Sequence, residues 1–238
     1  MLLLLNSIAN ENVKKVLLFD IDGTLLSSGG AGQIAMERAL VKAFSVELAE
    51  YKIETAGRTD RGIVSDLFTH HDIALDESIW AHFQSIYFEE LPVVLGSGRA
   101  RVLPGVPDLL EGLAQHDRAL MGVMTGNFER GADIKLSHFG LEKYFSFGFY
   151  GDDHHHRDDM ARMAWQLTRE RVWEEATPGD VWVIGDTPAD IQCARAIGAK
   201  VIAVATGMYS HDLLSGCNPD LLLNTLENSQ LIIETIFA

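Results

Sequence analysis

Cysteines, basic residues and long apolar runs are all scarce in this chain of 238 residues. The two cysteines, Cys193 and Cys217, exclude a disulfide scaffold and favour a reducing compartment. Lys and Arg total 19 against 34 Asp and Glu, and the net charge of −15 argues against nucleic acid or anionic membranes as partners. No stretch approaches the roughly 20 apolar residues of a membrane span, and residues 2–5 are too short for a signal-peptide core. These absences predict a soluble, cytoplasmic protein.

Short apolar runs alternate with amphipathic helical patterns along most of the chain. Six runs are typical of buried strands: 16–18, 119–124, 144–150, 181–184, 201–204 and 220–223. Helical patterns separate the runs, and this alternation predicts an α/β fold with a doubly wound parallel sheet.

One region departs from the alternation. From Gln33 to about Leu95, apolar residues recur at helical spacing without an intervening strand pattern. We therefore expect an inserted α-helical cap domain at 29–98, with 1–28 and 99–238 forming the core. Glycines near both borders predict hinges there.

Two carboxylates follow the first predicted strand. Asp20 and Asp22 are two residues apart, so they point to one face just past the strand's carboxyl end, where open α/β sheets bind ligands. Unit charges about 4 Å apart repel by roughly 4 kcal/mol at an effective dielectric near 20. The pair therefore needs a cation, a shared proton or solvent between its members, while Gly23 and Thr24 suit the sharp turn that follows.

Two later strands also end in polar residues: Thr125 follows one, and Asp186 and Asp190 follow another. The carboxyl ends of parallel strands share one edge, so we expect these residues to meet Asp20 and Asp22 in one crevice. Clustered carboxylates form a hard oxygen site of the kind that Mg²⁺ prefers. Asp186 and Asp190 could instead be no more than acidic residues at a helix N-terminus, where the helix dipole favours them.

Three segments carry a family resemblance. Residues 20–25 (DIDGTL), 125–127 (TGN) and 185–190 (GDTPAD) resemble, in this order, the motifs of the haloacid dehalogenase (HAD) superfamily. The helical insert directly after the first motif is similar to the phosphoglycolate-phosphatase-like branch. The resemblance implies a Mg²⁺-dependent phosphatase acting on a small phosphorylated metabolite, either phosphoglycolate-like or a sugar phosphate.

The resemblance also implies residue roles. Asp20 would be the nucleophile that forms an aspartyl-phosphate, and Asp22 would serve as general acid and then general base. Thr125, Gly126 and Asn127 would bind the phosphoryl oxygens. The implied Mg²⁺ ligands are Asp20, the backbone carbonyl of Asp22, Asp186 and Asp190.

The sequence departs from the family at one position. Phosphatases of this family usually carry a Lys between the third strand and the next helix, yet no Lys lies between Lys143 and Lys200. Arg157 is the nearest candidate, because its planar fork can bind phosphate and carboxylate; the alternative is a surface loop residue. The neighbouring histidines 154–156 suggest zinc, but three consecutive side chains do not easily face one metal.

A polar break, residues 56–61, interrupts the helical insert. In similar capped phosphatases a loop between cap helices reaches the active site, so Arg58 and Thr59 are candidate substrate-binding residues, with Asp60 beside them. The alternative is that Thr59 or Asp60 is a helix N-cap.

Two other functions compete with the phosphatase. A phosphomutase of the β-phosphoglucomutase type retains both aspartates. A phospho-acceptor or other non-catalytic binding module is a different class, although receiver domains lack an inserted cap and place the acceptor later in the sheet. A haloacid dehalogenase is disfavoured because its chemistry dispenses with the second acid, Asp22. The oligomeric state is left open between monomer and homodimer.

Overall fold

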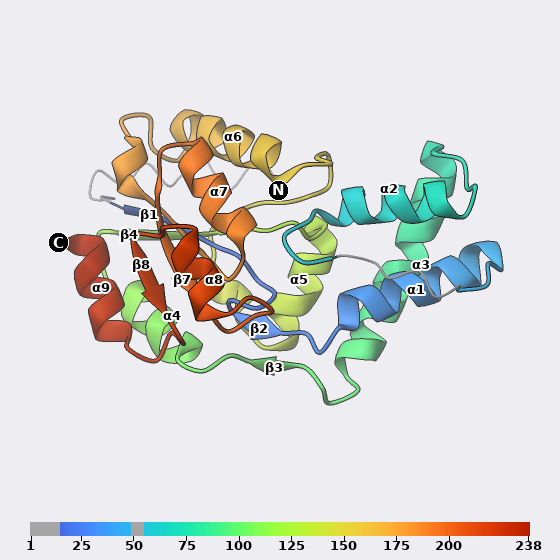
Figure 1. Cartoon of the computed structure of the whole chain (residues 1–238), viewed down its shortest axis with the longest axis horizontal. Coiled ribbons are helices and arrows are strands. Elements are labelled where there is room, and N and C mark those ends of the chain that lie inside the picture. Colours follow the sequence, from blue (N-terminus) through green and yellow to red (C-terminus); the bar gives the residue numbers. More distant parts are fainter. Residues whose placement is uncertain (1–14, 49–54) are drawn as a thin grey trace.

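The computed structural model describes residues 15–48 and 55–238. Its centre is a six-stranded sheet in which every neighbouring pair is parallel (Figure 1). The strand order is β5 (Phe147–Phe149), β4 (Ala119–Met124), β1 (Lys15–Phe19), β6 (Val181–Gly185), β7 (Lys200–Val204) and β8 (Leu221–Leu223). The chain winds outward from β1 to one edge and then returns to fill the other, which confirms the predicted doubly wound parallel sheet. This reversal places β1 between β4 and β6, at the switch point where such sheets bind ligands.

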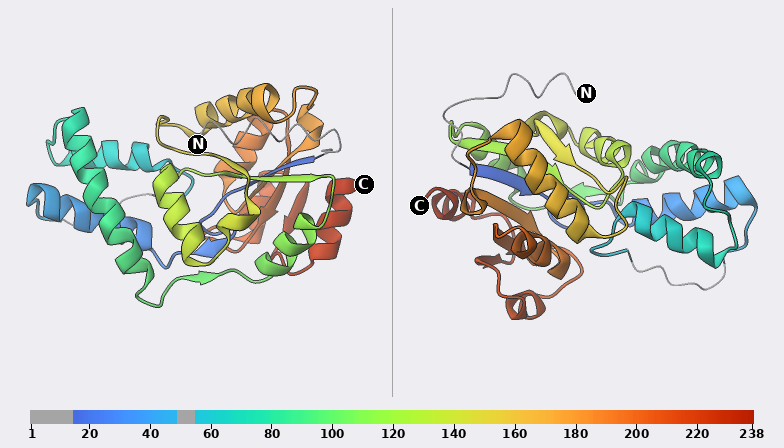
Figure 2. Two further views of the ribbon diagram at one scale, coloured as in Figure 1. Left: turned by 180° about the vertical axis from the view of Figure 1, so that it is seen from behind. Right: turned by 90° about the horizontal axis from the view of Figure 1, so that it is seen from above.

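Strand β1 shows why the sheet is apolar throughout. Leu17 and Phe19 join one buried cluster, whereas Val16 and Leu18 join the cluster on the opposite face, as the two-residue period of a strand requires. Helices cover both faces (Figure 2): α4 (Val106–Ala114), α5 (Glu129–His138) and α9 (Ser229–Phe237) contribute to the first cluster, and α6 (Arg157–Leu167), α7 (Pro188–Ala196) and α8 (His211–Gly216) to the second. Neither face of the sheet is left to solvent, as expected of a parallel sheet.

The region expected to be helical contains α1 (Ala31–Phe44), α2 (Asp60–His70) and α3 (Glu77–Leu95), which lie together to one side of the sheet (Figures 1 and 2). These helices bury their own apolar cluster, which Phe128 joins from the core. Their connections to the core run side by side as a short antiparallel pair, β2 (Leu26–Ser27) with β3 (Arg101–Val102). The part of the helical prediction at 49–54 lies outside the described residues, and the domain boundaries at 28/29 and 98/99 stay a prediction.

Two boundaries differ from the sequence prediction. The third strand is only Phe147–Phe149, because residues 142–144 form a 3₁₀ turn before it. Helix α6 begins at Arg157, whereas the helical pattern of the sequence begins three residues later, at Met160, and a π-helical turn at Thr168–Val172 ends the helix. The earlier start matters because it places Arg157 in the first turn of a helix.

Along the described part of the chain, no helix combines the length and the apolar character needed to cross a bilayer.

Candidate active site

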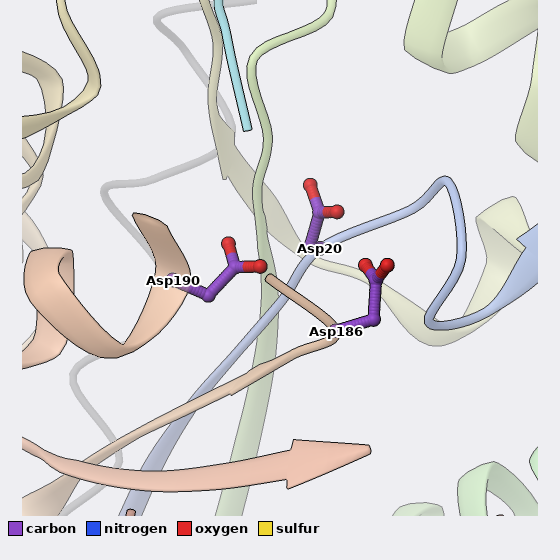
Figure 3. Close-up of side chains that lie close together, drawn as sticks. All are labelled: Asp20, Asp186 and Asp190. Atoms are coloured by element: carbon purple, nitrogen blue, oxygen red, sulfur yellow. The ribbon is translucent and has the colours of Figure 1, made fainter. Parts of the chain in front are cut away.

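Three carboxylates meet at the carboxyl edge of the sheet (Figure 3). Asp20 directly follows β1, Asp186 directly follows β6, and Asp190 lies in the first turn of α7. All three side chains are buried, and one oxygen from each lies within 4.8 Å of the others. The structure therefore brings together three of the residues that the sequence predicted to meet, and we call this set of three the acidic cluster.

The turn after β1 holds Asp186 in place. Thr24 Oγ1 donates to Asp186 Oδ1 at 3.2 Å. Gly23 has a φ of 86°, and a Cβ on it would lie 2.4 Å from Asp186 Oδ2. Only glycine satisfies both the positive φ and this close approach. The first motif thus shapes the third, although the two are about 160 residues apart in sequence.

Asp190 is both a helix cap and an ion-pair partner. Its Oδ2 accepts from the amide and the hydroxyl of Thr187, at 3.0 and 2.7 Å, forming a capping box for α7. Its Oδ1 accepts from Arg157 Nη2 at 2.5 Å. Asp190 therefore does lie at a helix N-terminus, but it is more than an acidic residue there, because its other oxygen faces the acidic cluster.

Arg157 is the cation of the acidic cluster. Its side chain is buried, and Nη2 lies 3.3 Å from Asp20 Oδ1 as well as contacting Asp190. Burial opposes its charge, but Asp190 and Asp20 raise its pKa above the usual range. The surface-loop interpretation of Arg157 is therefore wrong, because the guanidinium reaches the residue predicted to be the nucleophile.

Negative charge exceeds positive charge in the acidic cluster. Burial raises the pKa of Asp20 to about 7, with Arg157 opposing the shift. Burial, followed by the charges of Asp190 and Asp20, raises the pKa of Asp186 to about 9. One guanidinium does not balance three buried carboxylates, so a further cation or protons must do so. Hard carboxylate oxygens at this spacing fit Mg²⁺.

Asp22 stands apart from the acidic cluster and pairs with a lysine that the sequence analysis missed. Lys135 Nζ donates to Asp22 Oδ2 at 2.5 Å and to Asn127 Oδ1 at 2.9 Å. Burial acts against the Asp22 charge, but Lys135 holds the pKa of Asp22 below its usual value. A signal did exist: Ala132 and Leu136 lie on the buried face of α5, and helical spacing places Lys135 on that face too.

The segment after β4 lies beside Asp20. Thr125 is buried, and its Oγ1 accepts from the amide of Asn127 at 3.4 Å. Gly126 packs closely against the helical insert: a Cβ at this position would lie only 2.1 Å from the carbonyl oxygen of Arg58. All three residues of 125–127 line the same cavity as Asp20.

The N-terminus of α2 docks on the core through three consecutive residues, 59–61, which we call the α2 junction. Thr59 Oγ1 donates to the carbonyl of His155 at 3.2 Å, and Arg61 Nη1 donates to that of Asp152 at 3.2 Å. Asp60 binds the segment after β4 twice: its amide donates to Gly126 O at 2.7 Å, and its Oδ2 accepts from the Phe128 amide at 3.0 Å. Burial raises the pKa of the Asp60 carboxyl to about 6.

The prediction that Thr59 binds substrate needs correction. Its hydroxyl accepts from the Gly62 amide as the N-cap of α2, the side chain is fully buried, and it does not line the cavity. Because its one O–H already donates to His155, the hydroxyl has no donor left for a phosphate oxygen. Arg58 does line the cavity, and its Nη2 donates to Asp66 Oδ2 at 2.6 Å.

The cavity has a volume of about 400 Å³ and lies between the core and the helical insert. Asp20, Asp22 and Arg157 line it from the core, and Met36 and Arg58 from the insert. The three histidines do not form a metal site: among the described residues, the group arranged to hold a metal is the acidic cluster, and His154 Nε2 instead contacts Met163 Sδ at 3.3 Å.

Comparison with known proteins agrees with this geometry. The sequence matches the haloacid dehalogenase-like hydrolase family over residues 17–204. It is 30% identical over 125 residues to a phosphoglycolate phosphatase of Synechococcus elongatus, covering 52% of this chain and 56% of that protein. It is 26% identical over 225 residues to the "probable phosphatase IndB" of Dickeya dadantii, covering 90% of each.

Solved structures share the fold. CbbY from Rhodobacter sphaeroides, in complex with phosphate, superposes with a TM-score of 0.70 at 19% identity, covering 91% of this chain and 96% of that one. A predicted phosphoglycolate phosphatase from Haemophilus somnus superposes with a TM-score of 0.65 at 19% identity, covering 93% and 98%. The motifs, the fold and the sequence match agree, and the chain belongs to the haloacid dehalogenase-like hydrolase family.

Proposed function

We propose that the chain is a Mg²⁺-dependent phosphatase that hydrolyses a small phosphorylated metabolite through an aspartyl-phosphate on Asp20. The observation that carries the proposal is the position of Asp20. Its carboxylate is buried beside Arg157 and Asp186 and faces a cavity of about 400 Å³. A carboxylate surrounded by cationic and metal-binding groups suits phosphoryl transfer, which depends mainly on positioning and charge stabilisation.

In the first step Asp20 attacks phosphorus, and the bond from phosphorus to the leaving oxygen breaks. Asp22 has to enter this step protonated, against the effect of Lys135 on its pKa, and it gives that oxygen its proton. In the second step Asp22 takes a proton from water, the water oxygen attacks the aspartyl-phosphate, and the Asp20 carboxylate is restored with release of inorganic phosphate. Bound Mg²⁺ supplies positive charge to the phosphoryl oxygens. Asp20, Asp186, Asp190 and the backbone carbonyl of Asp22 would hold it.

Other residues of the site orient the phosphoryl group. Thr125, Gly126 and Asn127 line the cavity next to Asp20, where hydroxyl and amide donors can bind phosphoryl oxygens. Arg157 takes the place of the family's lysine, since its guanidinium reaches Asp20 from the first turn of α6.

The substrate we propose is phosphoglycolate-like or a sugar phosphate. The supporting features are the names of the sequence relatives, the cavity volume and the presence of Arg58 in its wall on the side of the helical insert. A guanidinium there suits a substrate with a second anionic group. Both cysteines are free thiols, which supports a cytoplasmic location; monomer or homodimer stays a prediction.

A panel of phosphorylated two- to six-carbon metabolites, assayed for released inorganic phosphate, tests the proposal. We expect release with Mg²⁺, none with EDTA, and recovery when Mg²⁺ is restored. Isomerised sugar phosphate without net phosphate release would support the phosphomutase instead. Recovery by Zn²⁺ alone, lost when residues 154–156 are changed to alanine, would overturn the magnesium assignment. Phosphorylation of the protein without turnover would indicate a phospho-acceptor module.

A further inference from the structure

Lys135 is a buried charge that the proposed mechanism does not use. Its side chain is 3% exposed, although lysines are rarely buried unless they are paired. Its ammonium contacts two residues of the candidate site, the carboxylate of Asp22 and the amide oxygen of Asn127. It also lines the cavity. Burying an ammonium costs free energy, so packing alone does not explain why α5 places Lys135 at the site.

The two buried cations of the site serve different carboxylates. Arg157 enters from α6 and contacts Asp20 and Asp190. Lys135 enters from α5 and contacts Asp22, whose carboxylate does not belong to the acidic cluster. Neither cation contacts the other's partner within hydrogen-bonding distance in the described residues. One cation therefore serves Asp20, the proposed nucleophile, and the other serves Asp22, the proposed acid and base.

Among the described residues, Lys135 is the one that forms an ion pair with the Asp22 side chain, while Ser28 and Asn127 also help to lower its pKa. The Asp22 side chain is about one-third exposed to the cavity, and its other oxygen, Oδ1, has no hydrogen-bond partner within the described chain. General acid–base catalysis requires the carboxylate to lie within hydrogen-bond reach of the proton that moves. A displacement of about 1 Å costs such a site much of its rate.

We propose that Lys135 is a positioning residue for Asp22: its ammonium, shared with Asn127, fixes the Asp22 carboxylate beside the leaving oxygen. The inference rests on the proposed function, because it assigns Asp22 to proton transfer. The alternative is a structural role in which Lys135 only neutralises the buried charges of Asp22 and Asp60.

Dependence on the leaving group separates the two roles. An alkyl phosphate needs a proton on its departing oxygen, whereas p-nitrophenyl phosphate releases a stable anion and needs little help. In Lys135→Met, kcat/KM on the best alkyl phosphate should fall by about tenfold or more, a part of the 10²–10⁴-fold that acid–base catalysis supplies. The value for p-nitrophenyl phosphate should change less than about threefold. Equal losses on both esters would overturn the inference.

A double-variant cycle closes the test. If Lys135 acts through Asp22, then Asp22→Asn with Lys135→Met should be no slower than Asp22→Asn alone; losses that multiply would overturn the inference. This comparison holds even if Lys135→Met alone folds poorly, because the double variant removes both charges of the pair. Lys135→Arg should retain most activity, and Lys143→Met, at an exposed lysine, is the matched control.

A wild-type protein that is folded but inactive would instead reject the proposed function. That result differs from losses that multiply in an active enzyme.

Discussion

The acidic cluster and the α2 junction are both buried and polar, but they differ in how their polar groups are satisfied. At the α2 junction, Asp60 and Thr59 find partners in the backbone of the core loops. In the acidic cluster, three carboxylates face one guanidinium, and Arg157 Nε has no partner in the described chain. The partners of the α2 junction are present in the fold itself, whereas the acidic cluster has excess negative charge that the proposed Mg²⁺ would balance. The first is therefore built for positioning and the second for chemistry.

Removing the cation of the acidic cluster should have the largest effect of the substitutions that follow. Arg157→Ala should lower kcat by roughly 10²-fold or more, the scale of losing one electrostatic stabiliser. Arg157→Lys should recover part of the rate, because it restores charge without the planar fork. Steady-state kinetics at saturating Mg²⁺ measure both variants.

The matched control is Arg162→Ala on the same helix, since Arg162 is exposed and pairs only with exposed Asp159 among the described ion pairs. An Arg157→Ala rate close to wild type would mean that the acidic cluster does not depend on its guanidinium, and the comparison with the α2 junction would lose its basis.

Arg58 tests whether specificity comes from the insert side of the cavity. Arg58→Ala should lower kcat/KM on the best metabolite by about tenfold, as loss of a charge-assisted contact predicts, and should change hydrolysis of a small generic ester little. Asp66→Ala is the control, because it removes a partner of Arg58 and keeps the guanidinium. Equal loss on both substrates would assign Arg58 to folding or closure of the insert, and no loss on either would leave it outside substrate recognition.

Asp60 gives the smallest effect, on stability. Its pKa rises from an ordinary 3.8 to about 6 on folding, chiefly through burial, with Lys135 and the Phe128 amide opposing and Asp22 and Asp152 adding to the shift. The protonated form is thus favoured by folding, so this contribution is complete below pH 3.8 and is lost as pH rises through about 6. Between pH 5 and pH 8 the loss is on the order of 1 kcal/mol.

Asp60→Asn removes this titration and keeps an oxygen that can accept from the Phe128 amide. The free energy of unfolding of wild type relative to the variant should therefore fall by about 1 kcal/mol from pH 5 to pH 8 in denaturant titrations. A difference that stays constant with pH would show that the α2 junction carries no buried titrating carboxyl.

Much of the fold and of the acidic cluster could be predicted from the sequence. Apolar runs ending in Asp20, Thr125 and Asp186 predict both a parallel sheet and the edge at which these side chains meet. Arg157 could also be singled out from the sequence, because the lysine usual in the family is absent between Lys143 and Lys200. Strand-end residues are predictable because local pattern and topology place them together.

Residues of the helices and of the α2 junction were harder to predict. Lys135 lies in the last turn of α5, where the sequence does not distinguish a buried lysine from an exposed one unless the buried face of the helix is traced. Thr59 was misassigned because the same residue types cap helices and bind substrates. The pairing of β2 with β3 spans only two residues on each side, too few for a strand pattern to appear.

The turnover of Asp20→Asn tests the central claim most directly. The substitution keeps the shape of the side chain and removes the nucleophilic oxygen charge. With Mg²⁺ and the best metabolite, the variant should release phosphate at less than a few per cent of the wild-type rate, while its circular dichroism and Tm show an intact fold. A folded variant that retains more than a few per cent of the wild-type rate would contradict covalent catalysis through Asp20.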